Sequence, residues 1–312
     1  MIAGIMNVLP PNLANVIERL SPQTMDRMEE IRVRINRPLE VMVDGLPLFL
    51  AYTVTSEDGT HLLNKISKYS IYALEEELRR GYITITGGHR IGLSGKVITE
   101  SGKVKAIRDV SSFNIRIAKQ KIGVAEPLLP YLYQKRWLST MIIGPPQTGK
   151  TTMLRDLARL MSSGVKEKNI ASCKVGVVDE RSEIAGCVEG IPQHDLGLRV
   201  DVLDGCPKAE GMMMLIRSMS PEVIVVDEIG RMEDSEATME AVNAGVGLLM
   251  SVHAFSYEDL IMRPTLREII SIRAVKRFVE LSRHKGPGSI KRILNEAGEE
   301  IYREEGVRRC SN

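Results

Sequence analysis

The chain has 312 residues, a length that fits two domains better than one. Hydrophobic residues make up 43% of it and charged residues 26%, which is typical of a folded globular protein and excludes a disordered or fibrous chain. The formal net charge of +2 gives no indication of a nucleic-acid-binding surface, or of a field that attracts acidic substrates.

The cellular compartment is indicated by the termini, the hydropathy and the cysteines. No apolar run approaches the roughly 18 residues of a membrane-spanning helix. The opening residues MIAGIMNVLPPN lack the basic flank and the cleavage site of a signal peptide. No C-x-x-C pair occurs, so we expect reduced thiols in a cytosolic protein. The cysteines are Cys173, Cys187, Cys206 and Cys310.

Residues 1–125 are expected to form a small α+β domain. Apolar and polar residues alternate through IRVRINRPLEVMVDG, residues 31–45, which predicts strands, and the Asp-Gly pair at its end favours a hairpin turn. Residues 70–80 have a helical pattern that Gly81 would end. Strands divided at a Gly-Gly pair are expected to follow.

Residues 126–312 are expected to form the larger domain, in which short apolar strands alternate with helical stretches. This alternation predicts an α/β fold with a mainly parallel sheet and helices on both faces. The segment SIKRILNEAGEEIYRE, residues 289–304, is expected to form a hairpin around its Ala-Gly pair. The strand candidates are residues 138–143, 174–178, 223–227 and 247–252.

The segment GPPQTGKT, residues 144–151, matches the phosphate-binding P-loop pattern and lies between an apolar strand and a helix. Small residues let backbone N–H groups approach a polyphosphate, and the following helix directs its unpaired N–H groups and positive dipole end toward the anion. A Gly-rich turn that binds nothing is the weaker alternative. We therefore predict a nucleoside triphosphate site formed by Gly144, Pro145, Pro146, Gln147, Thr148, Gly149, Lys150, Thr151 and Thr152.

Two side chains of this loop have a predicted chemical role. Lys150 would bridge the β- and γ-phosphates, and the Thr151 hydroxyl would bind Mg²⁺. We expect Lys150 to be an exposed loop residue that supports no core. Its replacement by alanine should therefore lower nucleotide affinity about tenfold or more and abolish turnover without unfolding the chain.

The segment PEVIVVDEIG, residues 221–230, supplies the acidic groups that hydrolysis requires. Asp227 and Glu228 end an apolar strand, and ligands of parallel α/β sheets lie at that end. We expect Asp227 to hold Mg²⁺ through water, and Glu228 to orient or deprotonate the attacking water. Such a pair is typical of P-loop proteins with an extra strand between the two motifs, and CKVGVVDERSEI, residues 173–184, is the candidate for that strand.

A second acidic cluster consists of Asp179, Glu180 and Glu183. It either belongs to the active site or has a structural role in pairing Arg181.

His253 lies in the segment GLLMSVHA, residues 247–254, just after the predicted strand ends. It either senses the γ-phosphate or is purely structural, and we include it with Lys150 and Glu228 among the predicted catalytic residues.

Together these motifs resemble a known superfamily. The P-loop, VVDERSE, MSPEVIVVDEIGR and AVNAGVGLLMSVHA are similar, in this order, to the Walker A, Asp box, Walker B and His box of secretion and pilus traffic ATPases. Within that superfamily the chain resembles the stage III sporulation protein AA family of endospore-forming bacteria. EEIRVRINRPLEVMVDG is similar to the opening of the family's N-terminal domain, and SSFNIRIAKQ to the segment before its linker.

The resemblance implies a RecA-like ATPase domain in residues 126–312 that uses ATP and Mg²⁺. It also implies a homohexameric ring on the mother-cell cytoplasmic face of the membrane that faces the forespore. The implied partners are membrane-embedded channel proteins of the stage III A operon, and the implied role is to power assembly of that channel or transport through it.

The arginine that completes the site is not given by the resemblance. Arg217 and Arg231 are each displaced by one residue from the superfamily's arginines near Walker B, so they are not carried over. We predict instead that Arg90 or Arg116, both from the first half of the chain, reaches the nucleotide.

Two alternatives remain open. A nucleic-acid-remodelling ATPase would need a basic patch interleaved with aromatic residues, and only 4% of the chain is aromatic, so no nucleic-acid partner is expected. A nucleotide-binding assembly module without turnover would carry the same motifs, because Glu228 could stay inactive until the protein assembles.

Overall fold

The structure is a computed structural model that describes residues 2–68, 81–100 and 102–304. The chain forms two compact units, which are considered separately. The first contains residues 1–119 and 186–193, and the second contains residues 120–185 and 194–312. Among the described residues, no helix combines the length and the apolar character required to cross a bilayer.

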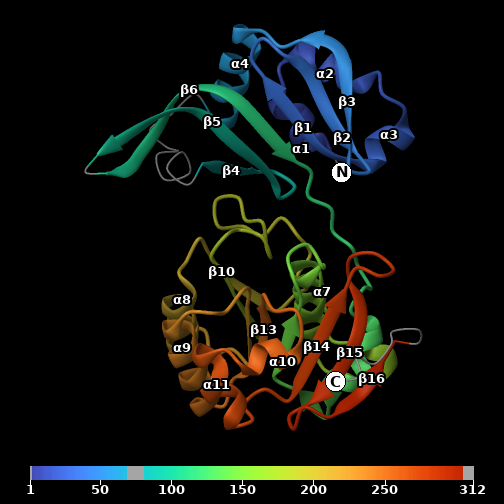
Figure 1. Cartoon of the computed structure of the whole chain (residues 1–312), viewed down its shortest axis with the longest axis vertical. Coiled ribbons are helices and arrows are strands. Elements are labelled where there is room, and N and C mark those ends of the chain that lie inside the picture. Colours follow the sequence, from blue (N-terminus) through green and yellow to red (C-terminus); the bar gives the residue numbers. More distant parts are fainter. Residues whose placement is uncertain (1, 69–80, 101, 305–312) are drawn as a thin grey trace. The chain divides into compact units, whose positions relative to one another are not determined.

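The first unit is built on a six-stranded sheet in the order β3-β2-β1-β6-β5-β4, with every neighbouring pair antiparallel (Figure 1). Its strands are β1 (Met28–Arg34), β2 (Pro38–Val43), β3 (Leu46–Thr53), β4 (Tyr82–Ile85), β5 (His89–Glu100) and β6 (Lys103–Arg116). Its helices are α1 (Ala3–Val8), α2 (Pro11–Glu18), α3 (Pro22–Arg27) and α4 (Ser56–Ile66).

One face of this sheet is apolar because its side chains alternate. Register places Ile31, Ile115 and Ile91 side by side, and all three are buried with α1, α2 and α4 in one core. The expected Asp-Gly hairpin is confirmed between β2 and β3, and the Gly-Gly turn is confirmed between β4 and β5. The helix expected at residues 70–80 falls outside the described residues.

The second unit contains an eight-stranded sheet in the order β11-β10-β12-β13-β9-β14-β15-β16, where only the last two pairings are antiparallel. Its strands are β9 (Thr140–Ile143), β10 (Val175–Asp179), β11 (Val200–Asp204), β12 (Val223–Val226), β13 (Gly247–Val252), β14 (Arg277–Ser282), β15 (Ser289–Asn295) and β16 (Glu300–Arg303). The antiparallel end confirms the hairpin expected around the Ala-Gly pair.

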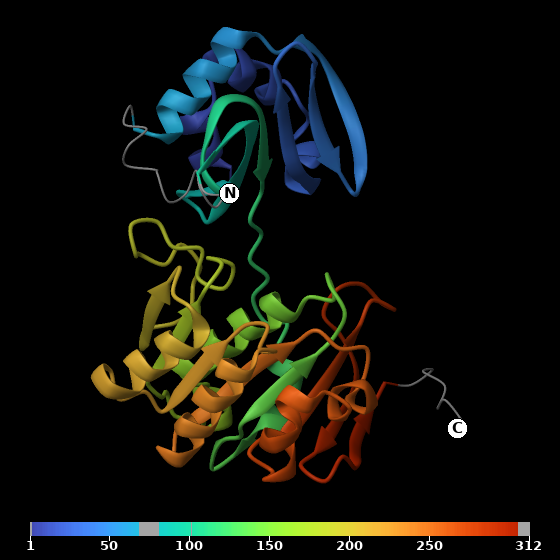
Figure 2. The ribbon, with the colours of Figure 1, turned by 60° about the vertical axis from the view of Figure 1, so that its left-hand side comes forward.

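Helices cover this sheet on both faces. The helices and short turns are η2 (Glu126–Leu128), α6 (Leu129–Leu132), α7 (Lys150–Ser163), η3 (Lys166–Lys168), α8 (Lys208–Ser218), α9 (Met232–Asn243), α10 (Tyr257–Ile261) and α11 (Pro264–Ser271). Apolar residues of β9, β12 and β13 form one core with α8, α9 and α11, which lie together in Figures 1 and 2. No α7 residue belongs to that core, and α7 contacts β9, β10 and β13 from the other face.

The predicted α/β fold class is therefore confirmed, with its antiparallel first sheet and mainly parallel second sheet. One strand assignment was wrong. The strand between the P-loop strand β9 and the Asp-Glu strand β12 is β13, which pairs with both. The proposed candidate, β10, lies on the outer side of β12. Sequence order did not reveal this, because the chain returns to the middle of the sheet only after β12.

Candidate active site

The candidate residues meet because four parallel strands end at one edge of the sheet. β10 pairs in register with β12, β12 with β13, and β13 with β9. Since ligands of such sheets lie outside the carboxyl ends of the strands, this edge is where a site is expected. The residues found at these strand ends are Asp179, Asp227, His253 and Gly144.

The P-loop has a backbone that requires glycine at two positions. Gly149, the N-cap of α7, has a φ of 90°. A Cβ at Gly149 would lie 2.8 Å from the amide nitrogen of Gly288, and one at Gly144 would lie 2.4 Å from Oγ1 of Thr148. Both distances are too short for a real contact, so the two glycines of the motif are needed for this conformation as well as for access to the backbone.

Lys150 is buried, with only 5% of its surface exposed, so the expectation of an exposed loop residue was wrong. Its Nζ donates to the carbonyl oxygens of Gly144 at 2.9 Å and Pro145 at 3.1 Å, and lies 3.0 Å from Nδ1 of His253. Burial lowers the pKa of this ammonium, although two nearby carboxylates oppose the shift. Lys150 therefore braces the loop in addition to carrying the charge that a phosphate would meet.

The remaining loop residues differ in exposure. Pro146 and Gln147 are exposed at the tip, whereas Thr148 is buried and its hydroxyl donates to the carbonyl of Pro145 at 2.8 Å. Thr152 lies in the first turn of α7. Pro145 and Pro146 have no backbone N–H, so the amide donors for a phosphate would come from the later part of the loop.

The predicted metal residues lie together. The Thr151 hydroxyl donates to Oδ2 of Asp227 at 2.8 Å, and the hydroxyl of Ser251 donates to the other oxygen of the same carboxylate. Mg²⁺ takes oxygen ligands and usually needs only one or two from the protein, with phosphates and water supplying the rest. The pair Thr151–Asp227 fits that requirement. The described residues contain no group of three or more His, Cys, Asp or Glu that could hold a metal alone.

Glu228 is held in a defined position. Its backbone has a φ of 55°, unusual for a residue with a side chain, and its amide donates to the Ser251 hydroxyl at 2.9 Å. One carboxylate oxygen lies 2.5 Å from Nε2 of His253, and the other accepts from Arg181 at 2.7 Å. Such a strained backbone persists only where its surroundings fix it, and it is common at functional sites.

His253 joins the two motifs. Its Nδ1 faces the ammonium of Lys150 at 3.0 Å, and its Nε2 faces the carboxylate of Glu228 at 2.5 Å. An ammonium can only donate and an ionised carboxylate can only accept, so this arrangement fits a neutral imidazole with its proton on Nε2. The sequence predicted the position of His253 at the strand end, but not this bridge.

The second acidic cluster borders the candidate site. Asp179, Glu180 and Glu183 line a small cavity of about 10 Å³ together with Asp227 and Glu228. Burial raises the pKa of Asp179, even though its carboxylate accepts three backbone N–H bonds, from residues 183 to 185. Asp179 thus fixes the loop that follows β10, next to the site.

Two basic residues at this edge have partners that the sequence analysis did not predict. Arg181 pairs with Glu228, a partner that the sequence did not predict. Arg155 of α7 is buried and donates to the carbonyls of Glu183 and Ile184 at 2.6 and 2.7 Å. Arg155 lies in a predicted amphipathic helix, on the side that is buried. A charged residue at such a position was the available signal for a buried partner.

The loop between β14 and β15 lies against the P-loop, which the sequence did not indicate. The Arg283 guanidinium donates to the Gln147 carbonyl at 3.1 Å and also contacts the Gln147 side-chain oxygen. The amide of Gly288 donates to the Thr148 carbonyl at 2.8 Å. These contacts hold the exposed tip of the P-loop from the side.

Of the four arginines considered for the phosphates, two belong to each unit. In the first unit, Arg90 stacks on the Tyr82 ring at 3.9 Å, and Arg116, its cross-strand neighbour, lies 3.5 Å from a Glu30 oxygen. In the second unit, Arg217 lies in the last turn of α8, and Arg231 is the N-cap of α9.

Comparison with known proteins agrees with these motifs. The family model "Sporulation stage III, protein AA" matches residues 3–301. Stage III sporulation protein AA of Bacillus subtilis (strain 168) is 58% identical over 306 residues, which cover 98% of this chain and 99% of that protein. The chain belongs to the stage III sporulation protein AA family. Protein SEEDLING PLASTID DEVELOPMENT 1 of Arabidopsis thaliana is 28% identical over 274 residues, 86% of this chain and 36% of that protein.

Solved structures show which fold this family shares. The ATPase DotB of Legionella pneumophila superposes with a TM-score of 0.60 at 15% identity, covering 89% of this chain and 82% of that one. The pilus retraction motor PilT, solved with bound ADP, superposes with a TM-score of 0.57 at 16% identity, covering 83% and 75%. This chain therefore has a fold similar to that of secretion and pilus ATPases, as the motif order predicted.

Proposed function

We propose that this chain is a Mg²⁺-dependent ATPase that hydrolyses ATP to ADP and phosphate and acts as a motor during sporulation. The observation that carries the proposal is the bridge through His253, which joins the P-loop lysine Lys150 to the carboxylate of Glu228. A nucleotide phosphate that contacts Lys150 would change the partners of His253, and so those of the residue predicted to act on water.

Glu228 is the residue assigned to the chemical step. A carboxylate offers about four lone-pair positions, and His253 and Arg181 occupy two of them. The free positions can accept a hydrogen bond from a water and orient it toward the γ-phosphate. Lys150 would hold the β- and γ-phosphates, and its buried position strengthens that contact because the local dielectric constant is low.

Thr151 and Asp227 would hold Mg²⁺. When bound, the ion would neutralise charge on the β- and γ-phosphates. Asp227 is also fixed by Ser251, so its carboxylate has little freedom to turn away.

The family and the superfamily resemblance support the proposed assembly and location. The superfamily resemblance supports a ring, proposed as a homohexamer, in which a neighbouring subunit or the first unit supplies the remaining arginine. Membership of a sporulation family supports a place in the mother-cell cytoplasm, at the membrane that faces the forespore. We propose membrane-embedded channel proteins of the stage III A operon as its partners, and assembly of that channel or transport through it as the work done.

One alternative has a structural observation in its favour. Lys150 already donates to the carbonyls of Gly144 and Pro145, and Glu228 already accepts from Arg181. These groups therefore have partners within the chain before any nucleotide binds. This also suits a nucleotide-binding assembly module without turnover.

An ATPase assay combined with size determination tests the proposal. Phosphate release by the full chain should require Mg²⁺, rise steeply with protein concentration as rings form, and disappear in Glu228→Gln. Binding of ATP by the ring without any phosphate release would favour the assembly module instead.

A further inference from the structure

A cavity of about 710 Å³ lies at the amino ends of the parallel strands, at the edge of the sheet opposite to the P-loop. Its walls are the segments that lead into β10, β12, β13 and β14, together with the hairpin of β7 (Tyr133–Gln134) and β8 (Arg136–Trp137). Its volume is within the range of about 300–1,000 Å³ that is typical of ligand sites. None of the residues assigned to the nucleotide lines it.

The cavity has an excess of positive charge. Glu222 is the acidic residue in its lining, and its carboxylate already accepts the Lys174 amide at 3.0 Å. Across the described part of the chain, no carboxylate forms an ion pair with any of the four cations in the lining. These cations are Lys135, Arg136, Arg273 and Lys276.

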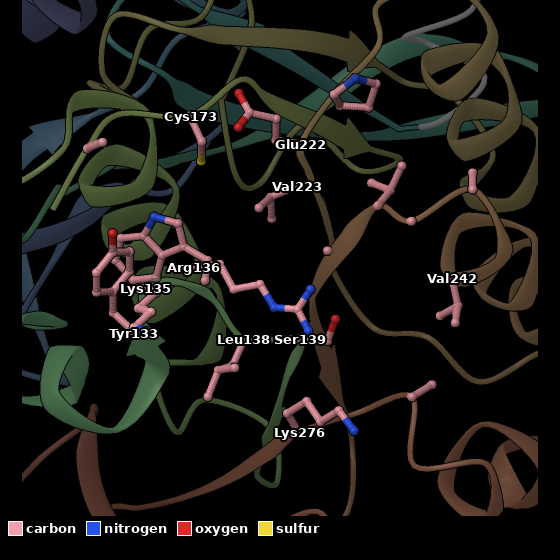
Figure 3. Close-up of a pocket in the computed structure, with 18 of the residues that line it drawn as sticks. Tyr133, Lys135, Arg136, Leu138, Ser139, Cys173, Glu222, Val223, Val242 and Lys276 are labelled. Carbon is pink, nitrogen blue, oxygen red and sulfur yellow. The ribbon is translucent and has the colours of Figure 1, made fainter.

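The cations are distributed around the cavity instead of converging on one point. Figure 3 shows the Arg136 side chain extending from the β7–β8 hairpin toward Ser139, with Lys276 on a separate segment. Glu296, outside the lining, interacts electrostatically with Arg273 and Lys276. An extended ligand with several anionic groups suits this distribution better than a compact one.

The cavity also has an apolar wall with an unmet donor. Trp137 is 8% exposed, and its buried indole Nε1 has no acceptor among the described residues. Leu138, Val223 and Val242 continue this wall. An apolar side chain of a ligand could therefore be buried beside the cations.

The helices that reach the cavity end there. α9 and α11 contribute residues at or just after their last turns, Val242 and Ile272 among them. Most of their last carbonyls are already capped by backbone N–H groups. In α9 the carbonyls of Ala241 and Val242 accept from Val246 and Gly245, and in α11 those of Ile269 and Ile270 accept from Ala274 and Arg273. These carbonyls therefore do not distinguish a peptide from a phosphate group, and the apolar wall beside the cations is the feature that favours a peptide.

We propose that this cavity binds an acidic, extended segment of a partner protein, with its carboxylates on the four cations and an apolar side chain against the wall formed by Trp137. This proposal does not depend on nucleotide hydrolysis, because the cavity lies at the other edge of the sheet.

The chain carries its own reporter, since Trp137 is the only tryptophan in the sequence. The full chain should be titrated with the blocked peptide Glu-Glu-Phe-Glu-Glu while tryptophan fluorescence is recorded. We expect a saturable change that weakens with salt, because exposed charge pairs are screened. The matched peptide with lysine in place of glutamate should produce no change. An equal response to both peptides, or no response to the acidic one, would overturn the proposal.

Variants locate the binding. The double variant Arg136→Ala, Lys276→Ala removes two of the four cations and should bind the acidic peptide about tenfold or more weakly, which corresponds to about 1.4 kcal/mol. The matched double variant Lys166→Ala, Lys168→Ala changes exposed lysines of the turn before β10 and should bind as the parent does. Thermal unfolding of both variants should match the parent. Equal peptide affinity in the two double variants would overturn the assignment.

The same peptide and variants also test two other possible occupants of the cavity. If inorganic phosphate displaces the peptide at equal concentration, the cavity is a simple anion site and the peptide assignment fails. If sedimentation shows that the parent associates with itself and the Arg136→Ala, Lys276→Ala variant does not, the occupant is a second copy of this chain and the partner assignment fails. Peptide binding by a chain without ATPase activity would leave this proposal intact and count only against the proposed function.

Discussion

The two edges of the C-terminal sheet differ in how their charged side chains are satisfied. At the carboxyl edge, Lys150, His253 and Glu228 contact one another in series, and each polar group has a partner. At the amino edge, Arg136 and Lys276 border a cavity of about 710 Å³ and form no ion pair with a described residue. Paired groups are organised before a ligand arrives and suit chemistry, whereas unpaired cations around a cavity gain partners only on binding and suit recognition.

The substitution expected to disrupt the carboxyl edge of the sheet most is Lys150→Ala. Nucleotide affinity should fall about tenfold or more, because a hydrogen bond to a charged group contributes about 1.5–3 kcal/mol. Turnover should disappear. The carbonyls of Gly144 and Pro145 would lose their buried donor, so the free energy of unfolding should fall by about 1–3 kcal/mol. Calorimetric titration with ATP and urea unfolding measure the two effects, with the exposed Lys166→Ala as control. Unchanged ATP affinity would reject the P-loop assignment.

The next test asks whether the carboxyl edge is complete without the first unit. Arg90 and Arg116 are cross-strand partners, so the double alanine variant removes both arginines from one place on that sheet. If one of them reaches the γ-phosphate, turnover should fall by about 10³-fold or more while ATP still binds. Steady-state phosphate release measures this fall in turnover, and Arg108→Ala, on β6 with Arg116, is the control. Turnover equal to that of the control would show that the arginine comes from elsewhere.

Glu228→Gln separates binding from chemistry at the organised edge. The amide keeps the shape but cannot act as a base, so turnover should fall by about 10²–10⁴-fold while ATP remains bound. Asp227→Asn should instead weaken the dependence on Mg²⁺. Single-turnover measurements with labelled ATP distinguish the two, and a parental rate in Glu228→Gln would remove that residue from the chemical step.

Arg283→Ala should have a smaller effect, because this residue acts on the P-loop and not on the phosphates. Losing its hydrogen bond to the Gln147 carbonyl should cost about 1 kcal/mol, or roughly a fivefold rise in KM with little change in kcat. Steady-state kinetics provide both parameters, and Arg267→Ala, on the exposed surface of α11, serves as control. A large loss of kcat with unchanged KM would contradict this positioning role.

The smallest effect concerns pH. Burial lowers the pKa of Lys150 below its ordinary value of 10.5, so the folded chain binds fewer protons than the unfolded chain at pH values between the lowered and the ordinary pKa. Stability contributed by this site should therefore rise as pH increases through that window. Urea unfolding of the parent and of Lys150→Met across alkaline pH measures the difference. A gap between the two that stays constant with pH would argue against the shift.

The predictable part of the carboxyl edge was local in sequence. The P-loop and the Asp227–Glu228 pair each combine a short apolar strand with chemically distinctive residues, so neighbours along the chain carry the signal. The bridge through His253 and the contact between Arg283 and Gln147 join residues more than 100 positions apart. No periodicity reports such a pairing, because it depends on the order of the strands in the sheet.

β14 shows the same limit for the fold. Its segment RFVELS was not among the strand candidates, and a charged residue, Glu280, interrupts its apolar run. The structure buries Glu280 with 1% exposure and pairs it with Arg292 at 2.5 Å and Lys291 at 3.3 Å, both from β15. A buried charge is tolerated where partners neutralise it, and those partners are known only once the strands are paired.

β13 extends from the amino edge of the second sheet, where the cavity lies, to the carboxyl edge with the nucleotide site. It begins at Gly247, which lines the cavity, and is followed directly by His253 in the nucleotide site. Five of its six residues are buried, so a displacement at one end would disturb the packing along the whole strand. If the nucleotide state shifts this strand, thermodynamic linkage requires that a peptide in the cavity change the affinity for ATP by the same factor by which ATP changes the affinity for the peptide. Two titrations of one protein would then report a single coupling free energy.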